Sequence, residues 1–476
     1  MTINRKSGFN AMKLVVALYL AFMTGCSSLP KMVPDMEVQA QPVQVEGARG
    51  PLSYKQSQAI IKRLKANSGG ETNIFDRHLA MEEAVVGSPL IVGNKATLLI
   101  DGPTTYKSMF EAIEKAKDHI NLETYIFDPD EAGQRFADAL IAKQQSGVQV
   151  NIIYDSVGSL NTPAEFFQRL RDTGMNVLEY NPVNPLKLRK GWNVNQRDHR
   201  KLMIIDGEIA FVGGINISGV YSSGSSSFGS RSGSSSTSED DEKGAEDIPW
   251  RDTHVRIEGP VVSEFQKLFI TTWTEQKGKP LASRNYLPKQ KAKGKLVIRA
   301  IGSSPLEPYS QIYVTLISAI NSAETSICIT NAYFVPDPQL KQALKDAAAR
   351  GVDVRLILPG KTDSKLVWYA SRSHYTDLLK DGVKIYERQD ALLHAKTAVI
   401  DGVWSTIGST NLDWRSFLHN QELDAVVLGD EFGRQVSDMF EMDLQDSREI
   451  TLEQWKDRPL VDRIKEFGAR LWARWL

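Results

Sequence analysis

Residues 198–207 read DHRKLMIIDG and residues 393–402 read LHAKTAVIDG, so both stretches contain the pattern His-x-Lys-x4-Asp-Gly. In a strand, residues i and i+2 lie on the same face, and each His therefore shares a face with its Lys. The Asp-Gly pair is a strong signal for a hairpin turn. One such strand alone would be an ordinary edge strand with solvated charges. Two copies at matching places indicate a duplicated functional motif, made by His199, Lys201, His394 and Lys396.

The sequence that follows each copy also repeats. Residues 211–218 read FVGGINIS and residues 406–413 read TIGSTNLD, and each contains a Gly followed shortly by an Asn. Each predicted hairpin therefore returns through a second strand toward Asn216 or Asn411. Pairing of the two copies would bring the two His and two Lys side chains together, with an Asn from each half.

The motif lies inside a longer repeat of helices and strands. In the first half, strands are predicted at 121–127 and 148–155, each after an amphipathic stretch with helical spacing. In the second half, strands are predicted at 327–335 and 352–360, again with a helix before each. Alternation of strands with helices of this length predicts parallel β-α-β units and an α/β fold. With 476 residues, we expect two domains, at 55–290 and 291–450.

The N-terminus has the features of an export signal. A basic segment precedes an apolar run at 14–23, which is too short to span a bilayer. The sequence before Cys26 resembles a bacterial lipobox, and Ser27 resembles a sorting signal for the Gram-negative outer membrane. We expect a lipid-anchored protein facing the periplasm, with the outer membrane favoured over the inner; a plain signal peptide with a chance Cys is the alternative. The expected segments are a signal peptide at 1–25, lipidation at Cys26 and a tether at 26–54.

Two further segments differ in composition from the repeat. Residues 222–247 are rich in Ser and Gly, cannot bury a core, and are expected to form a disordered insert. Residues 451–476 contain an amphipathic helix with Ile464, Phe467 and Leu471 on one face. That face either lies in a membrane interface or packs on the core, and the sequence leaves both open.

The residue types in the motif favour a phosphodiester over a metal ion. Lys is cationic and repels a divalent ion, so we expect neither a metal nor another cofactor. Two Lys and two Asn side chains suit the anionic oxygens of a phosphodiester, and two His can act as nucleophile and acid. The formal net charge of −1 argues against bulk nucleic-acid binding.

The duplicated motif with its downstream Gly and Asn resembles the phospholipase D superfamily. The stretches WNVNQRDHRK (192–201), IAFVGGINIS (209–218) and WRDTHVRIEGP (250–260) look most like bacterial cardiolipin synthases. The resemblance implies two similar α/β/α domains with mixed, largely parallel sheets. It further implies that they pack with pseudo-twofold symmetry and share one active site at their interface.

The resemblance also implies roles for single residues. One His attacks phosphorus and forms a phosphatidyl-histidine, and the other acts as acid and then base; we favour His199 as the nucleophile and His394 as the acid. The Lys and Asn residues would bind phosphoryl oxygens. Asp252 and Glu422 are the candidates, by alignment of the repeats, for orienting the histidines. Asp206 and Asp401 complete the catalytic motif and are expected to brace it rather than to touch substrate.

The expected reaction is phosphatidyl transfer between molecules of phosphatidylglycerol, which makes cardiolipin at a membrane surface. Hydrolysis to phosphatidic acid would use the same residues with water as the acceptor. A phosphodiesterase acting on nucleic acid and a non-catalytic lipid-binding protein are the more distant alternatives. We expect a monomer that binds anionic phospholipid and no nucleic acid.

Overall fold

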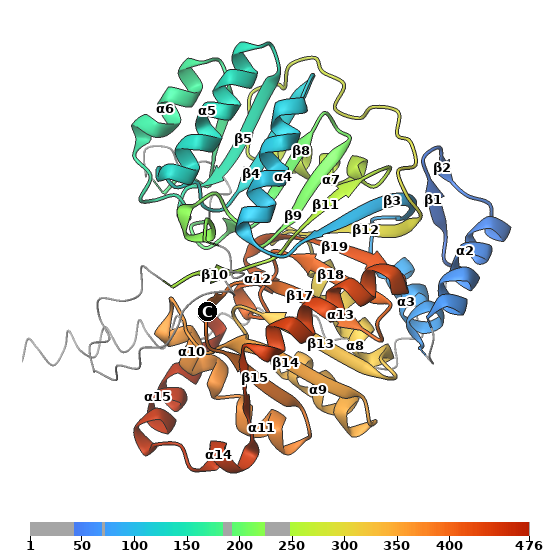
Figure 1. Ribbon diagram of the computed structural model, residues 1–476, viewed down its shortest axis with the longest axis vertical. Coiled ribbons are helices and arrows are strands. Elements are labelled where there is room, and N and C mark those ends of the chain that lie inside the picture. The colour runs from blue at the N-terminus through green and yellow to red at the C-terminus, as the bar shows by residue number, and fades with distance from the viewer. Residues whose placement is uncertain (1–41, 69–71, 184–192, 224–247, 476) are drawn as a thin grey trace, which may run out of the picture.

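The computed structural model describes residues 42–68, 72–183, 193–223 and 248–475. The predicted signal peptide, Cys26 and residues 224–247 of the predicted insert lie outside these ranges. Two α/β domains lie one above the other along the long axis of the molecule (Figure 1).

The first domain contains the repeat that the sequence predicts. Its three parallel strands are β4 (His119–Thr124), β5 (Gln149–Asp155) and β6 (Asn176–Tyr180). Next to β4 lie the antiparallel strands β8 (Leu202–Ile205), β9 (Ile209–Gly213) and β11 (His254–Glu258). The covering helices are α4 (Gly102–Lys115), α5 (Glu131–Gln145), α6 (Ala164–Asp172) and α7 (Val262–Glu275).

The second domain repeats this arrangement. Its parallel strands are β13 (Ser326–Asn331), β14 (Asp353–Pro359) and β15 (Lys384–Arg388). The antiparallel strands are β17 (Lys396–Ile400), β18 (Trp404–Gly408), β19 (Asn420–Leu428) and β12 (Leu296–Ser303), with β20 (Ser447–Ile450) beside β15. The helices are α8 (Gln311–Ser322), α9 (Pro338–Ala349), α10 (Lys365–Arg372), α11 (Tyr375–Lys380), α12 (Trp414–Leu418) and α13 (Asp430–Gln445).

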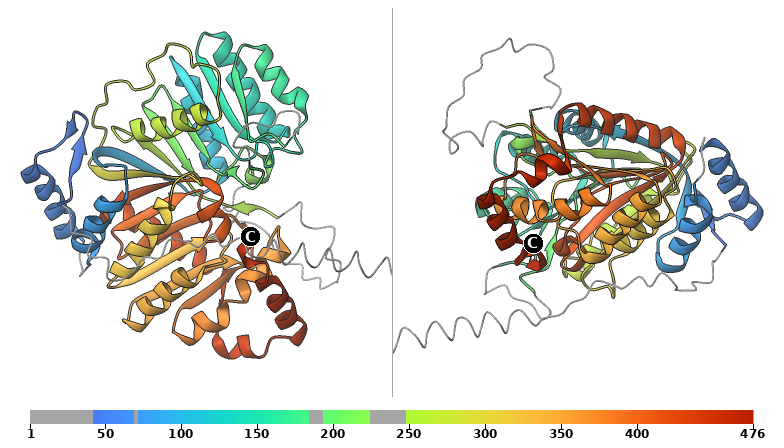
Figure 2. Two further views of the ribbon diagram at one scale, coloured as in Figure 1. Left: turned by 180° about the vertical axis from the view of Figure 1, so that it is seen from behind. Right: turned by 90° about the horizontal axis from the view of Figure 1, so that it is seen from below.

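Strand β3 (Leu90–Leu99) joins the two sheets. Its C-terminal half pairs with β11 of the first domain, from Lys95 to Leu99, and its N-terminal half pairs with β12 of the second domain. Figure 2 shows the same two-domain arrangement from behind and from below. The two domains therefore share one continuous sheet.

The sheets differ from the expectation of largely parallel pairing. Apart from a few two-residue pairings, parallel pairing in the described part of the chain is confined to β4–β6 in the first domain and β13–β15 in the second, and the other pairings are antiparallel. The motif accounts for two of the antiparallel pairings: the turns at Asp206 and Asp401 fold β9 back on β8 and β18 back on β17, and hairpin strands are antiparallel.

The packed fold begins earlier than the predicted tether boundary. Val43 and Val45 are buried, and β1 (Val45–Gly47) pairs in parallel with β3. It also pairs with β2 (Gly50–Pro51), ahead of α2 (Tyr54–Asn67). Burial of these valines and pairing with the sheet hold the segment in the fold.

Candidate active site

Short strands at the domain boundary fix the positions of both histidines. Strand β7 (Arg197–Asp198) pairs in parallel with the first residues of β19, and the His199 N–H donates to the carbonyl of Gln421 at 3.0 Å. Strand β16 (Leu392–Leu393) pairs in parallel with β10 (Trp250–Arg251), and the His394 N–H donates to the carbonyl of Arg251 at 2.8 Å. Each histidine is therefore placed beside a strand of the opposite domain.

This pairing gives each histidine a carboxylate from the other half of the chain. The Nδ1 atom of His199 lies 3.1 Å from both carboxylate oxygens of Glu422. The Nδ1 atom of His394 lies 2.7 Å from Oδ2 of Asp252. Both histidines are largely buried, and a carboxylate at Nδ1 favours the tautomer that leaves Nε2 free to react.

The two carboxylates are held in different ways. Glu422 accepts a hydrogen bond from the Ser409 hydroxyl at 2.5 Å, while Oδ1 of Asp252 accepts from the Thr253 N–H at 2.7 Å. Gly214 occupies the place that Ser409 has in the second domain. A Cβ atom on Gly214 would lie 2.2 Å from Oδ1 of Asp252. Glycine is therefore required there for the shorter carboxylate to reach its histidine.

Burial dominates the ionisation of the histidines. It lowers the pKa of His199 to about 4, although the charge of Glu422 opposes the shift. The pKa of His394 is also lowered, by burial and by the charge of Lys396. Burial raises the pKa of Asp252 and Glu422, but the neighbouring cations and histidines outweigh it and leave both values below the usual range. At neutral pH the site thus holds neutral imidazoles and ionised carboxylates.

The two lysines form a buried cationic pair. The Nζ atom of Lys201 donates to the carbonyl of His199 at 2.5 Å, and Lys396 donates to the carbonyl of His394. Burial lowers the pKa of Lys201 to about 7 and that of Lys396 to about 8. The nearby carboxylates of Glu422 and Asp252 oppose both shifts. A bound anion would favour the charged form of both side chains, so the pair is suited to a phosphate group.

The two asparagines are buried but differ in their contacts. Oδ1 of Asn216 accepts from the Ile126 N–H at 3.1 Å, and its Nδ2 donates to the Tyr221 hydroxyl at 3.1 Å. Among the described residues, Oδ1 of Asn411 has no hydrogen-bond partner. Contact of either amide with a phosphoryl oxygen stays a prediction.

Asp206 and Asp401 accept hydrogen bonds from the backbone of neighbouring turns. Each lies at the far end of its motif strand, with a positive φ of 52° and 50° respectively. The Asp206 carboxylate accepts the N–H groups of Lys117, Asp118 and His119. Asp401 accepts equivalent bonds from the turn at residues 324–326. Both carboxylates thus hold a turn at the end of a motif strand, and a bracing role in catalysis stays a prediction.

Aromatic residues around the histidines were not predicted as site residues. Tyr125 lies with its ring centroid 5.1 Å from that of His199, and Tyr333 lies 6.4 Å from His394. The hydroxyl of Tyr221 is 3.3 Å from Nδ1 of His394. Tyr125 and Tyr333 occupy equivalent places in the sequence repeat, and this equivalence is the feature of the sequence that could have identified them as site residues. Tyr221 borders the Ser-rich insert and has no counterpart in the second half.

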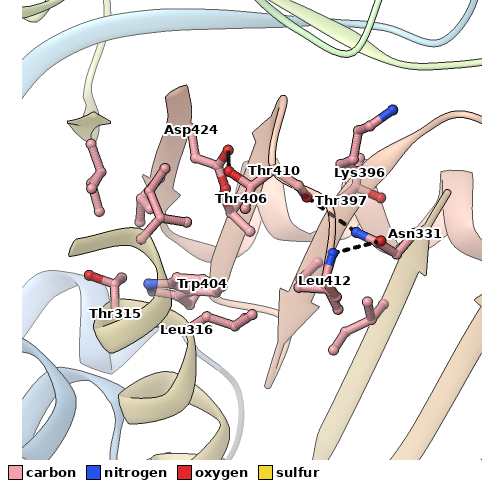
Figure 3. Close-up of a pocket in the computed structure, with 15 residues that line it drawn as sticks. Thr315, Leu316, Asn331, Lys396, Thr397, Trp404, Thr406, Thr410, Leu412 and Asp424 are labelled. Carbon is pink, nitrogen blue, oxygen red and sulfur yellow. Dashed lines mark hydrogen bonds between the residues drawn. The ribbon is translucent and has the colours of Figure 1, made fainter. Parts of the chain in front are cut away.

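An apolar cavity in the second domain is separate from the histidines. It lies between α8 and the sheet, and Lys396 extends its amine away from it (Figure 3). At its edge, the side chain of Asn331 donates to the carbonyl of Thr410 and accepts from the Leu412 N–H. These bonds hold the loop that carries Asn411.

Comparisons with curated proteins point to one activity. The chain is 36% identical over 395 residues to a cardiolipin synthase of Geobacillus sp. (strain WCH70), covering 83% of this chain and 74% of that protein. It is also 36% identical over 382 residues to the major cardiolipin synthase ClsA of Bacillus subtilis (strain 168), covering 79% and 74% of the two chains.

The comparisons contradict the predicted cellular location. The matched relatives are cardiolipin synthases of Geobacillus and Bacillus, and they provide no support for an export signal or a lipid anchor. Within the described ranges, no helix is both long and apolar enough to cross a membrane. We therefore withdraw the expectation that a lipid on Cys26 holds the protein at the periplasmic side of a membrane.

A solved structure and a family model agree with the fold and the repeat. The phosphatidylserine synthase of Haemophilus influenzae Rd KW20 superimposes with a TM-score of 0.62 at 14% identity, covering 84% of this chain and 100% of that one, which shows a shared fold. The model of the family described as "Cardiolipin synthase, PLD-like domain" matches residues 109–223 and 316–444, one segment in each domain. The chain therefore belongs to the cardiolipin synthase family of phospholipase D-like proteins.

Proposed function

We propose that the protein is a phosphatidyltransferase that makes cardiolipin and glycerol from two molecules of phosphatidylglycerol. The observation that carries this proposal is the pair of His–Lys motifs, each with a carboxylate from the opposite domain, in a member of the cardiolipin synthase family. The substrate is an anionic phospholipid presented by a membrane surface. The protein acts as a monomer, because one chain supplies both halves of the site.

The first step transfers the phosphatidyl group to the enzyme. Nε2 of His199 attacks phosphorus, and the bond between phosphorus and the headgroup oxygen breaks. His394, which carries a proton on Nε2 once the anionic phosphate is bound beside it, donates that proton to the headgroup oxygen, so glycerol leaves and a phosphatidyl-histidine remains. In the second step, His394 accepts the proton of a hydroxyl on a second phosphatidylglycerol. That oxygen attacks phosphorus, the phosphorus–nitrogen bond breaks, and cardiolipin is released.

The contacts of the histidines support this assignment of roles. Asp252 lies 2.7 Å from His394, closer than the 3.1 Å between Glu422 and His199. A closer carboxylate better stabilises the imidazolium that a general acid must form. Lys201 and Lys396 hold the charge on the phosphoryl oxygens during transfer, with Asn216 and Asn411 beside them.

Lipid mass spectrometry tests the reaction. Purified protein supplied with phosphatidylglycerol should release cardiolipin and glycerol in equal amounts. Phosphatidic acid as the main product would instead identify a hydrolase, and cleavage of a DNA control would identify a nuclease.

Trapping of the intermediate tests the roles of the histidines. With labelled phosphatidylglycerol and a denaturing quench, an acid-labile adduct should form with the wild type and the His394→Ala variant. The His199→Ala variant should form none. An adduct that survives His199→Ala but is lost in His394→Ala would reverse the assignment.

A further inference from the structure

The C-terminal helix α15 (Leu460–Arg470) has its apolar face turned away from the protein. Leu460, Ile464, Phe467 and Leu471 recur at helical spacing and are 68%, 63%, 68% and 61% exposed. An amphipathic helix ordinarily packs such a stripe on the core. We call these four residues the α15 stripe.

The opposite side of α15 holds it to α10. Glu466 is buried and accepts hydrogen bonds from the guanidinium of Arg458, one of them at 2.7 Å. Ala469 packs in a small buried cluster with Ala370 and Val335. The helix is therefore attached through a charged and a small residue, and the orientation that exposes the stripe is fixed by these contacts.

Basic side chains flank the stripe. Arg463, Lys465 and Arg470 are exposed on α15, and Arg474 is exposed in the turn that follows. The two acidic residues of α15 are less accessible to solvent than these cations, since Asp462 is only partly exposed and Glu466 is buried. Apolar residues bordered by exposed cations suit the boundary between the acyl chains and headgroups of an anionic bilayer.

Helix α15 is connected to the surroundings of His394 through α10. Helix α10, on which α15 packs, follows Asp363, and that carboxylate accepts the hydroxyl of Tyr333 near His394. The guanidinium of Arg474 lies 5.7 Å from the ring of Trp414, at the start of α12. Figure 1 shows α15 beside α10 at the lower left of the second domain, with β10 and α12 near the boundary between the two domains.

We infer that the α15 stripe docks the enzyme on a bilayer that contains anionic phospholipid. Docking there would hold the domain that carries His394 against the headgroups that contain the substrate phosphate. This inference extends the proposed function by naming the surface that receives the lipid substrate, and it rests on that proposal for the identity of the lipid.

Hydrogen–deuterium exchange of the full chain tests the surface directly. Vesicles of phosphatidylglycerol and phosphatidylcholine should slow amide exchange across residues 460–472 by at least about threefold. Pure phosphatidylcholine vesicles should slow it less, since the basic flank then has no anionic partner. Unchanged exchange in this segment while the protein is bound to vesicles would overturn the inference.

A double variant tests the consequence for turnover. Ile464→Glu/Phe467→Glu should reduce the vesicle-bound fraction and turnover on vesicles at least about fivefold, and leave turnover of detergent-dispersed phosphatidylglycerol within about twofold. Met442→Glu is the matched control, since Met442 is a 49% exposed apolar residue on α13. Phe467→Ser is the milder second variant if the double variant folds poorly.

The outcomes separate the two proposals. Loss of vesicle binding in the double variant, with no cardiolipin made from dispersed lipid even by the wild type, would retain the docking surface and reject the proposed function. If the double variant binds vesicles as well as the wild type and makes cardiolipin normally, the docking surface is rejected and the proposed function is retained. A wild-type dimer that the double variant disrupts, with vesicle binding unaltered, would assign the stripe to a second copy and overturn the docking inference.

Discussion

His199 and Glu422 lie 223 residues apart in the chain, yet the imidazole Nδ1 is 3.1 Å from each oxygen of the carboxylate. His394 of the second domain is likewise in contact with a carboxylate of the first domain, that of Asp252. The two domains therefore do more than contribute one histidine each, because each also places a carboxylate at Nδ1 of the other domain's histidine.

Neutralising either carboxylate should lower the rate without unfolding the protein. Glu422→Gln and Asp252→Asn keep the shape of the side chain but no longer stabilise an imidazolium, and an amide can also favour the wrong tautomer. We expect kcat to fall by about 100-fold to 10,000-fold, as for orienting carboxylates in hydrolase triads. Steady-state kinetics with a thermal-unfolding control measures this, and near-normal kcat in both variants would contradict an orienting role.

Gly214→Ala should mimic the loss of Asp252. The added Cβ would lie 2.2 Å from Oδ1 of Asp252 and must displace that carboxylate from His394. We expect kcat to fall at least about tenfold, in keeping with the sensitivity of catalysis to small misplacements. Gly87→Ala is the matched control, since a Cβ there meets no atom within 4 Å.

Affinity for the anionic lipid should fall as the pH rises from 7 to 9. A lysine is charged below its pKa and neutral above it, and burial places the pKa of Lys201 at about 7 and of Lys396 at about 8. KM on dispersed phosphatidylglycerol should therefore increase across this range. His199, with a pKa of about 4, stays neutral throughout and contributes no change. In the Lys201→Arg variant, whose side chain keeps its charge, KM should depend less on pH. A pH profile of KM identical to that of the wild type would exclude Lys201 as the titrating group.

Tyr221→Phe should reduce kcat by several-fold while leaving the fold intact. The hydroxyl contacts His394 and Asn216, whereas the ring packs against Trp250 at 5.4 Å between centroids. Phe retains the ring and removes the hydrogen bonds, whose individual contribution is about 1 kcal/mol. A change in KM alone would instead indicate a role in lipid binding.

Asp206→Asn should affect stability more than catalysis. Asn tolerates the left-handed backbone at this position but cannot match a carboxylate that accepts three N–H groups. We expect the free energy of unfolding to fall by roughly 2 kcal/mol, with kcat per folded molecule nearly unchanged. Denaturant titration together with active-site counting separates these effects.

The local features of the site could be predicted from the sequence. The spacing of His199 and Lys201 and the turn at Asp206 depend on the strand period and on turn chemistry, which are local. Alignment of the two halves also identified Asp252 and Glu422, because both repeats carry an acid at the corresponding place.

The contact between each histidine and a carboxylate of the other domain could not be predicted in the same way. Which carboxylate serves which histidine depends on the pairing of β7 with β19 and of β10 with β16. Those registers arise only when the domains pack. Tyr221 has no equivalent in the second half, so the repeat could not indicate it. The periodicity of α15 identified its apolar face, but only tertiary contacts of Glu466 and Ala469 decide that this face points outward.

The crossed histidine–carboxylate pairs make the site dependent on both domains of the chain. During synthesis, the chain up to β11 already contains His199, Lys201 and Asp252, but the carboxylate that orients His199 follows only at residue 422. A nascent or truncated first domain thus lacks both Glu422 and the second motif histidine. The proposed lipid chemistry is in this way coupled to synthesis of the second domain, which supplies both Glu422 and His394.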